Sequence, residues 1–392
     1  MTGIPLVYGR FDLRPVGGAE GDIVHLHGYF FRCSTVGFLF FIGVVSALTK
    51  PGIVVKFTFM TLLNVSFNQM NWLNVHLRSR SRLSSREITM ATDNAAPQIK
   101  NEDTPRGFAF ALTAYLMWGF LPFYLKAVAH LPPLEVLAHR ALWSVPVAGA
   151  VLLILKRTEE LKVAIRTPSM LGMACVTAAF ITVNWGIYVW AIANNHALEG
   201  ALGYFINPLF SFFLAAVILR EKLSPLQLAA IALAGVGVVI LTVGSGGLPW
   251  ISLGLAFSWG CYALFRKTLP IGPNQGFFLE VLLISIPALP YIIYLEWTGQ
   301  GHLFHGTSFD TFILMLAGPI TAGPLMIYAN GAKLLRLSTI GIMQYIAPTM
   351  IFLIAIFAFK EPLSTVKLVS FVFIWSALAV YSYGMLKAAK GR

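Results

Sequence analysis

The sequence predicts an all-α membrane protein in which ten transmembrane helices form two inverted five-helix repeats. Of its 392 residues, 57% are apolar and 11% are charged, whereas about a quarter of the residues of a soluble protein are charged. A bilayer is therefore the expected environment, and a helix needs about 20 mostly apolar residues to cross its roughly 30 Å of hydrocarbon. A stretch near the middle of the chain also returns 140 positions later, which predicts that the membrane part is built twice.

The repeated stretch covers residues 202–227 and returns at residues 342–367. Each copy has a proline within an apolar run, and each run ends at a charged turn that contains Leu-Ser. A repeat of this length is too long for a solenoid unit, so it predicts one half of a duplicated chain. Because five helices per half is an odd number, the second half would enter the membrane in the opposite orientation. The identical pairs are Ile206/Ile346, Pro208/Pro348, Phe212/Phe352, Ala215/Ala355, Glu221/Glu361, Leu223/Leu363 and Ser224/Ser364.

Prolines mark the starts of several predicted helices, because the fixed backbone angle of proline suits the first helical position, where its missing N–H is not needed. Pro132-Pro133, Pro168, Pro225 and Gly272-Pro273 are expected at helix starts or turns. The expected helices lie at about residues 107–127, 133–155, 168–192, 198–219, 225–243, 248–267, 276–296, 310–330, 338–359 and 363–386.

Residues 1–89 differ in composition from the rest of the chain. The apolar run at 35–49 is only 15 residues long, and an Arg- and Ser-rich stretch separates it from Met90, which opens a polar tail. We interpret residues 1–89 as an over-extended reading frame or a disordered leader, with a short span at 35–49 as the alternative. The expected division is a leader and tail over 1–106, a first repeat over 107–244, a second repeat over 245–387 and a short basic tail over 388–392.

The distribution of basic residues between loops predicts the orientation. If the tail before the first helix is cytoplasmic, that side of the membrane carries 15 Lys and Arg residues and the other side carries Lys126, Lys360 and Lys367. Short cytoplasmic loops are enriched in Lys and Arg, so both termini are predicted to be cytoplasmic. The basic turn at Lys360 is an exception, because it stays on the outer side.

Composition and motifs exclude several other classes. The net charge of +12 comes from basic residues that occur singly or in pairs, without the stripe or module of a nucleic-acid-binding protein. Cys33, Cys175 and Cys261 lack metal-site spacing, and the sequence has no Walker lysine loop and no HExxH. His302 and His305 lie near Asp310 with the spacing of two metal ligands, but no further ligand cluster accompanies them. We expect no metal and no cofactor.

The second predicted span contains polar residues that hydrocarbon would reject. Glu135, His139 and Trp143 are spaced i, i+4, i+8 and share one face, with Arg140 about 100° round from His139. A charge at mid-helix costs about 2.5–3.5 kcal/mol even on the lenient insertion scale, so these groups must face each other or water. Either Glu135 lies at the outer interface and pairs structurally with Arg140, or His139 and Arg140 line a cavity and bind an anionic or polar group or relay a proton.

Other predicted spans add amides and aromatic rings. Pro208 frees a backbone carbonyl one turn earlier, and Asn207 either satisfies that carbonyl or contacts a substrate. Rings supply contact area and amides fix orientation, a combination that suits an amphipathic organic substrate, although some rings could belong to interfacial belts. The residues expected to contribute to a central cavity are Glu135, His139, Arg140, Asn184, Trp185, Tyr188, Tyr204, Asn207, Tyr328 and Gln344.

Several blocks together resemble a known family. The motifs LEVLAHRALWS, NNHALEGALGYFINPL, RLSTIGIMQYIAPT and FIWSALA resemble the RarD proteins, the chloramphenicol-sensitive branch of the EamA family in the drug/metabolite transporter superfamily. The resemblance runs from about Arg106 to Lys387. It implies two inverted five-helix EamA units, cytoplasmic termini and a permease of the bacterial inner membrane, and it leaves the substrate open.

The expected function is secondary transport of a small organic molecule by alternating access, since inverted repeats are typical of transporters with a midplane site. The expected partners are that small molecule and the lipid bilayer, without nucleic acid, and the sequence does not predict an oligomeric state. An intramembrane enzyme is one alternative, but the elbow-like Ala256-Phe257-Ser258-Trp259-Gly260 lies within a span rather than on a strand-to-helix turn. A passive channel or scaffold is the other alternative.

Overall fold

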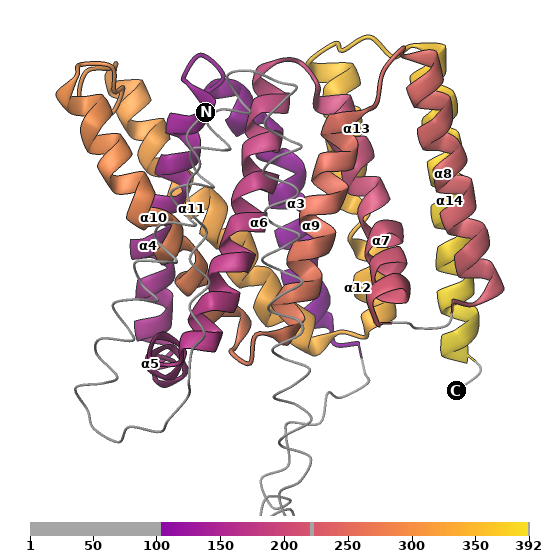
Figure 1. The fold of residues 1–392 in the computed structure, drawn as a ribbon, viewed down its shortest axis with the longest axis horizontal. Coiled ribbons are helices and arrows are strands. Elements are labelled where there is room, and N and C mark those ends of the chain that lie inside the picture. The colour runs from indigo at the N-terminus through magenta and orange to yellow at the C-terminus, as the bar shows by residue number, and fades with distance from the viewer. Residues whose placement is uncertain (1–102, 220–222, 391–392) are drawn as a thin grey trace, which may run out of the picture.

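The computed structural model of the chain describes residues 103–219 and 223–390, and the regular elements in these ranges are helices (Figure 1). Eight candidate membrane spans, judged by length and apolar composition, lie within this described part. The predicted leader at residues 1–89 and the alternative span at residues 35–49 lie outside the described residues. The prediction of an all-helical chain with membrane-spanning helices is confirmed for the part that the structure describes.

Proline begins five of these helices, and the predicted starts at Pro133, Pro168 and Pro225 are confirmed. Helix α10 begins at Pro273 rather than at the predicted residue 276. The helices are α3 (Pro105–Ala127), α4 (Pro133–Ile154), α5 (Glu159–Arg166), α6 (Pro168–Ala193), α7 (Ala197–Leu219), α8 (Pro225–Gly244), α9 (Trp250–Thr268), α10 (Pro273–Trp297), α11 (Ser308–Gly331), η1 (Ala332–Leu334), α12 (Leu337–Met343), α13 (Ile346–Leu353), η2 (Ile354–Ala358) and α14 (Thr365–Lys390).

Two local features differ from the predicted segments. The short helix α5 lies between α4 and α6, where a loop was expected. The ninth segment, predicted as one helix over residues 338–359, consists of α12, α13 and the π-helix η2, with a turn at Gln344 and Tyr345. Pro348 has no N–H to bond the carbonyl of Gln344, four residues earlier, and its ring crowds that carbonyl. The regular helix is therefore interrupted at this turn.

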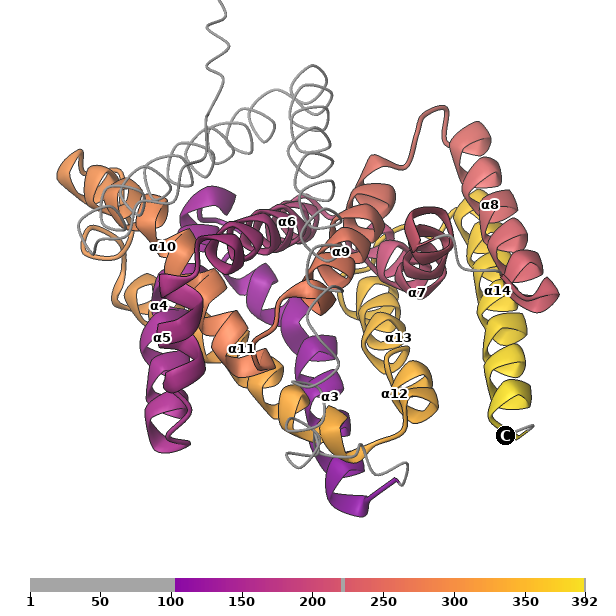
Figure 2. The same ribbon diagram turned by 60° about the horizontal axis from the view of Figure 1, so that its bottom comes forward.

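The main helix contacts join the part of the chain before residue 245 to the part after it. Helix α3 packs against α11 and α13, and α9 packs against α6 and α7. Helix α4 packs against both α10 and α11, α8 packs against α14, and α7 contacts α13. Figures 1 and 2 show α8 and α14 side by side at one end of the bundle, with α4 and α10 at the other end. Helices from both halves therefore pack against each other from one end of the bundle to the other.

Glu361 joins the two halves at the start of α7. Its carboxylate is buried, and its two oxygens accept hydrogen bonds from the backbone N–H groups of Ala197 and Leu198 at 2.7 and 2.9 Å. These N–H groups belong to the first turn of α7, where they have no partner within the helix. A negative charge is also favourable there, because the helix dipole is positive at that end.

Replacing Glu361 with alanine should leave both N–H groups without an acceptor inside the protein. A buried donor without a partner costs about 1–3 kcal/mol, so we expect a lower melting temperature for Glu361→Ala in detergent and an intermediate one for Glu361→Gln. Glu159→Ala is the matched control, because that carboxylate is exposed and its partner within the described ranges is the neighbouring Lys162 on the same helix. Equal melting temperatures for Glu361→Ala and Glu159→Ala would contradict the capping role.

Candidate functional site

Arg140 lies at the centre of a polar cluster built from three helices. It belongs to α4 and is buried, with 3% of its surface exposed. Its Nε donates a hydrogen bond to Oγ1 of Thr321 on α11 at 3.1 Å, and its guanidinium carbon lies 4.9 Å from the ring centroid of Trp185 on α6. Its Nη1 has no hydrogen-bond partner in the described part of the chain. The guanidinium group is thus held by both halves of the protein while one of its donor nitrogens remains without a partner.

None of the carboxylates that are buried in the described residues forms an ion pair with Arg140. Each contacts a different group, and these contacts lie elsewhere in the bundle. They are Glu135 with His302, Glu280 with Arg266, Asp310 with His130, and Glu361 with the backbone of Ala197 and Leu198. The cluster around Arg140 is therefore positively charged within a largely apolar bundle.

Tyrosine and asparagine side chains of α6 and α7 continue the cluster. Asn184 donates through Nδ2 to the carbonyl of Leu255 and to Oγ of Ser258, and its Oδ1 accepts from the Tyr204 hydroxyl at 3.4 Å. The rings of Tyr188 and Tyr204 meet edge to face, with centroids 5.2 Å apart. Both tyrosines lie close enough to Arg140 to interact with its charge, and the buried hydroxyl of Tyr188 has no hydrogen-bond partner among the described residues. The sequence-predicted residues of these two helices thus gather beside Arg140.

His139 contacts Trp143 rather than the Arg140 cluster. Nε1 of Trp143 donates a hydrogen bond to Nδ1 of His139 at 3.1 Å, as expected for two residues that share one helical face. Since Nδ1 accepts this bond, the proton of the neutral ring lies on Nε2, which is buried without a partner in the described part of the chain. No interaction given by the structure links His139 to the guanidinium of Arg140.

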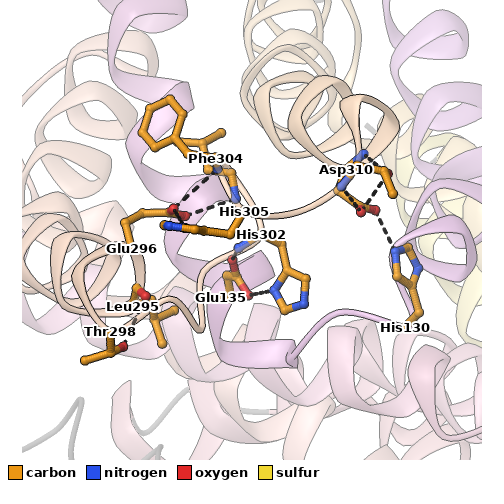
Figure 3. A network of polar contacts seen from close by, with 11 residues as sticks. His130, Glu135, Leu295, Glu296, Thr298, His302, Phe304, His305 and Asp310 are labelled. Carbon is orange, nitrogen blue, oxygen red and sulfur yellow. Dashed lines mark hydrogen bonds and ion pairs between the residues drawn. The ribbon is translucent and has the colours of Figure 1, made fainter.

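Glu135 lies at the start of α4 and contacts the loop between α10 and α11, as Figure 3 shows. Its Oε1 accepts from the backbone N–H of His302 at 2.7 Å, and its Oε2 lies 2.8 Å from Nδ1 of the same residue. The interpretation of Glu135 as a structural partner of Arg140 is therefore corrected. The partner is a histidine 167 positions away, which the spacing within α4 could not indicate.

Two further histidine–carboxylate pairs flank this contact (Figure 3). His305 lies 2.9 Å from Glu296, and His130 lies 2.7 Å from Asp310. The weak metal-site candidate paired His302 with His305, but the structure places these two histidines against different carboxylates. No group of three potential ligands suited to a metal is found among the described residues. The Glu135–His302 pair instead ties the start of α4 to the α10–α11 connection, and the His130–Asp310 pair ties the α3–α4 loop to the first turn of α11.

Removing the carboxylate of Glu135 should loosen the loop at residues 298–307. Hydrogen bonds to charged groups contribute about 1.5–3 kcal/mol, so local opening should become roughly 10- to 100-fold more frequent in Glu135→Ala. Hydrogen–deuterium exchange of the loop amides measures this effect. Exchange in the α8–α9 connection at residues 245–249 serves as the internal control and should not change. Unchanged protection at residues 298–307 would contradict the anchoring role.

The remaining predicted residues are not joined to the Arg140 cluster. Tyr328 packs its ring against Tyr115 and Trp118, with centroids 5.6 and 5.5 Å away. Gln344 donates to the carbonyl of Gly341 at 2.9 Å within its own turn. Asn207 is buried and its Oδ1 has no hydrogen-bond partner among the described residues. Of the predicted site, the structure therefore brings together Arg140, Asn184, Trp185, Tyr188 and Tyr204, and it leaves Glu135, His139, Asn207, Tyr328 and Gln344 apart from them.

Two residues that sequence reasoning did not single out complete the cluster. Thr321 accepts the Arg140 hydrogen bond, and Tyr124 lies near the Arg140 charge while its hydroxyl donates to the carbonyl of Ile313 at 3.1 Å. A lone threonine in an apolar helix gives no signal of its own. The only hint at Thr321 is its position between Pro319 and Pro324, since prolines within spans are tolerated where polar groups can compensate.

The chain is similar in sequence to a transporter family and to several bacterial proteins. Residues 105–243 match the EamA-like transporter family. The chain is 37% identical over 287 residues to an "Uncharacterized transporter" of Vibrio cholerae, covering 73% of this chain and 95% of that protein. It is 36% identical over 294 residues to the "Protein RarD" of Streptomyces exfoliatus, covering 74% and 93%. It is 37% identical over 280 residues to the "Protein RarD" of Escherichia coli, covering 71% and 95%.

Proposed function

This chain belongs to the EamA-like transporter family, in the branch of the RarD proteins, and we propose that it is a secondary transporter for a small organic metabolite or drug. Transport would proceed by alternating access across the bacterial inner membrane. The observation that carries the proposal is the buried Arg140 cluster, which combines α4 and α6 of the first half with α11 of the second. Substrate sites of inverted-repeat transporters lie where the two repeats meet.

Two inverted five-helix repeats would provide the two-sided access that this mechanism needs. The ten spans are the eight candidate spans together with α7 and α9, with α12 and α13 counted as one span. If the helices of the two halves are paired in chain order, α3 corresponds to α9, α4 to α10, α6 to α11, α7 to α12–α13, and α8 to α14. The contact of α3 with α11 then corresponds to the contact of α9 with α6, because each helix is replaced by its equivalent in the other half. The contact of α4 with α10 joins two equivalent helices. This reciprocity supports the repeat.

The proposed orientation places both termini in the cytoplasm, since 15 basic residues would lie on that side and three on the other. The Glu135–His302 contact and its neighbouring histidine pairs would then lie at the periplasmic end of the bundle. We assign these pairs to closure of that end. Arg140, Asn184, Trp185, Tyr188 and Tyr204 are assigned to substrate binding.

An intramembrane enzyme and a passive channel are the rival functions, and flux measurements distinguish all three. Comparison of metabolites between cells lacking and overproducing the protein supplies candidate substrates. Uptake of each candidate into proteoliposomes, with and without a pH gradient, then tests transport. We expect uptake that saturates and that accelerates when the same compound is present inside. Flux without saturation or acceleration would indicate a channel, and a chemically altered product would indicate an enzyme.

A further inference from the structure

The positive charge of Arg140 is not balanced within the described part of the chain. Every carboxylate in these residues contacts a group other than Arg140. A buried charge is costly unless it is paired and hydrogen-bonded. The cluster is therefore chemically complementary to a negatively charged group, and a cation there would add repulsion to the cost of desolvation.

The surroundings of the guanidinium restrict how an anion can approach. The guanidinium carbon lies over the ring of Trp185, 4.9 Å from its centroid, and Thr321 accepts a hydrogen bond from Nε. The buried Nη1 has no partner among the described residues, so an anion would meet the edge of the group that carries Nη1. A carboxylate matches the planar fork of a guanidinium edge. The unpartnered hydroxyl of Tyr188 offers a further donor in the same cluster.

The number of positive charges limits the charge of the anion. Arg140 is the only cationic side chain among the cluster residues Arg140, Tyr124, Asn184, Trp185, Tyr188, Tyr204 and Thr321. A phosphate monoester carries about −1.5 to −2 at neutral pH, which a single arginine does not neutralise. A carboxylate carries one negative charge and would leave the pair neutral. The cluster therefore favours a monoanion over a phosphorylated compound.

The aromatic side chains indicate the body to which the carboxylate is attached. Trp185 packs edge to face with Phe277, and Tyr188 packs edge to face with Tyr204. Aromatic rings prefer offset or edge-to-face contacts with other rings and offer large apolar contact areas. They would suit a planar or apolar group beside the charged end of the substrate.

We propose that the transported compound is a small organic acid, bound as a monoanion with its carboxylate at Nη1 of Arg140 and its aromatic or apolar body against Trp185 and Tyr188. This assignment rests on the proposed transport function, because it names the chemical class that the same site accepts. It goes beyond the RarD relationship, which does not define what this chain carries.

The test uses the full chain in detergent or nanodiscs and compares four probes of similar size. Benzoate is the carboxylate, benzamide its neutral analogue, benzylammonium the cation and phenyl phosphate the dianion, with sodium chloride as the inorganic control. Among these compounds, we expect only benzoate to raise the melting temperature, and we expect the shift to reach a plateau as the benzoate concentration increases. Arg140→Gln should weaken benzoate binding about 10- to 100-fold, the loss expected for one charge-assisted hydrogen bond. Arg140→Lys should retain part of it, because the charge remains without the planar fork.

Arg157→Gln is the matched control, since Arg157 is exposed in the connection after α4, and it should bind benzoate normally. The assignment is overturned if benzoate produces no shift, if another probe or chloride stabilises the protein equally, or if Arg140→Gln binds benzoate normally. Flux assays with metabolites selected without regard to charge distinguish a wrong anion assignment from a wrong transport function. Saturable transport of a cation would overturn only the anion assignment, whereas the absence of any flux would overturn the proposed function.

Discussion

Replacing Arg140 with methionine is expected to abolish transport while the melting temperature of the protein becomes no lower than that of the unchanged chain. Arg140 is a buried charge without a counter-ion in the described residues, and its guanidinium group donates one hydrogen bond within them, to Thr321. Replacing buried ionic groups by apolar residues of similar volume is often neutral or stabilising by about 1–4 kcal/mol. A residue kept for its structure would show the opposite result, since its removal would destabilise the fold.

Initial rates of uptake into proteoliposomes and melting curves of the same preparations measure the two effects of Arg140→Met. The matched control is Arg157→Met, which removes an exposed arginine and should alter neither rate nor melting temperature. If Arg140→Met took up substrate at the same rate as the unchanged chain, Arg140 would not be part of the substrate site. A marked fall in its melting temperature would show instead that Arg140 holds α4, α6 and α11 together. The paired measurement therefore separates a binding role from a packing role.

Local signals predicted most of the helices, but they could not predict how each proline would act. Pro208 and Pro348 occupy equivalent positions in the two copies of the repeated stretch. Helix α7 continues through Pro208, whereas the equivalent segment is interrupted at Gln344 and Tyr345, one turn before Pro348. Proline removes the same backbone donor in both cases. The difference therefore depends on neighbouring helices, which sequence spacing does not reveal.

The candidate site was predictable where its residues share a helix or neighbouring helices. Asn184, Trp185 and Tyr188 lie within two turns of α6, so their grouping follows from helical geometry. Tyr328 was expected at the same site because it lies before Pro348 as the first-half residues lie before Pro208, and it stands 140 positions after Tyr188. If the repeats are inverted, as we propose, equivalent residues lie toward opposite faces of the membrane. The separation of Tyr328 from the Arg140 cluster is then the expected consequence of the repeat.

Close packing of α4 against α11 makes Gly318 the second residue with a large expected effect. A Cβ atom at Gly318 would collide with the backbone carbonyl of Trp143 on α4, and a backbone atom cannot rotate away as a flexible side chain can. Thr321 follows three residues later, on the same face of α11, where it accepts the hydrogen bond from Arg140. The missing side chain of Gly318 thus lets α11 approach α4 closely enough for this contact.

Gly318→Ala should therefore reduce both stability and transport, because α11 must move away from α4 to accommodate the methyl group. Overpacking of this kind costs about 1–3 kcal/mol, and the displaced Thr321 would no longer hold the guanidinium of Arg140. Gly323→Ala is the matched control on the same helix, since an added Cβ there would lie at an ordinary 3.6 Å from Met117. Melting temperature and uptake rate should fall in the first variant and change little in the second. Equal behaviour of the two variants would mean that close contact between α4 and α11 is not what positions Arg140.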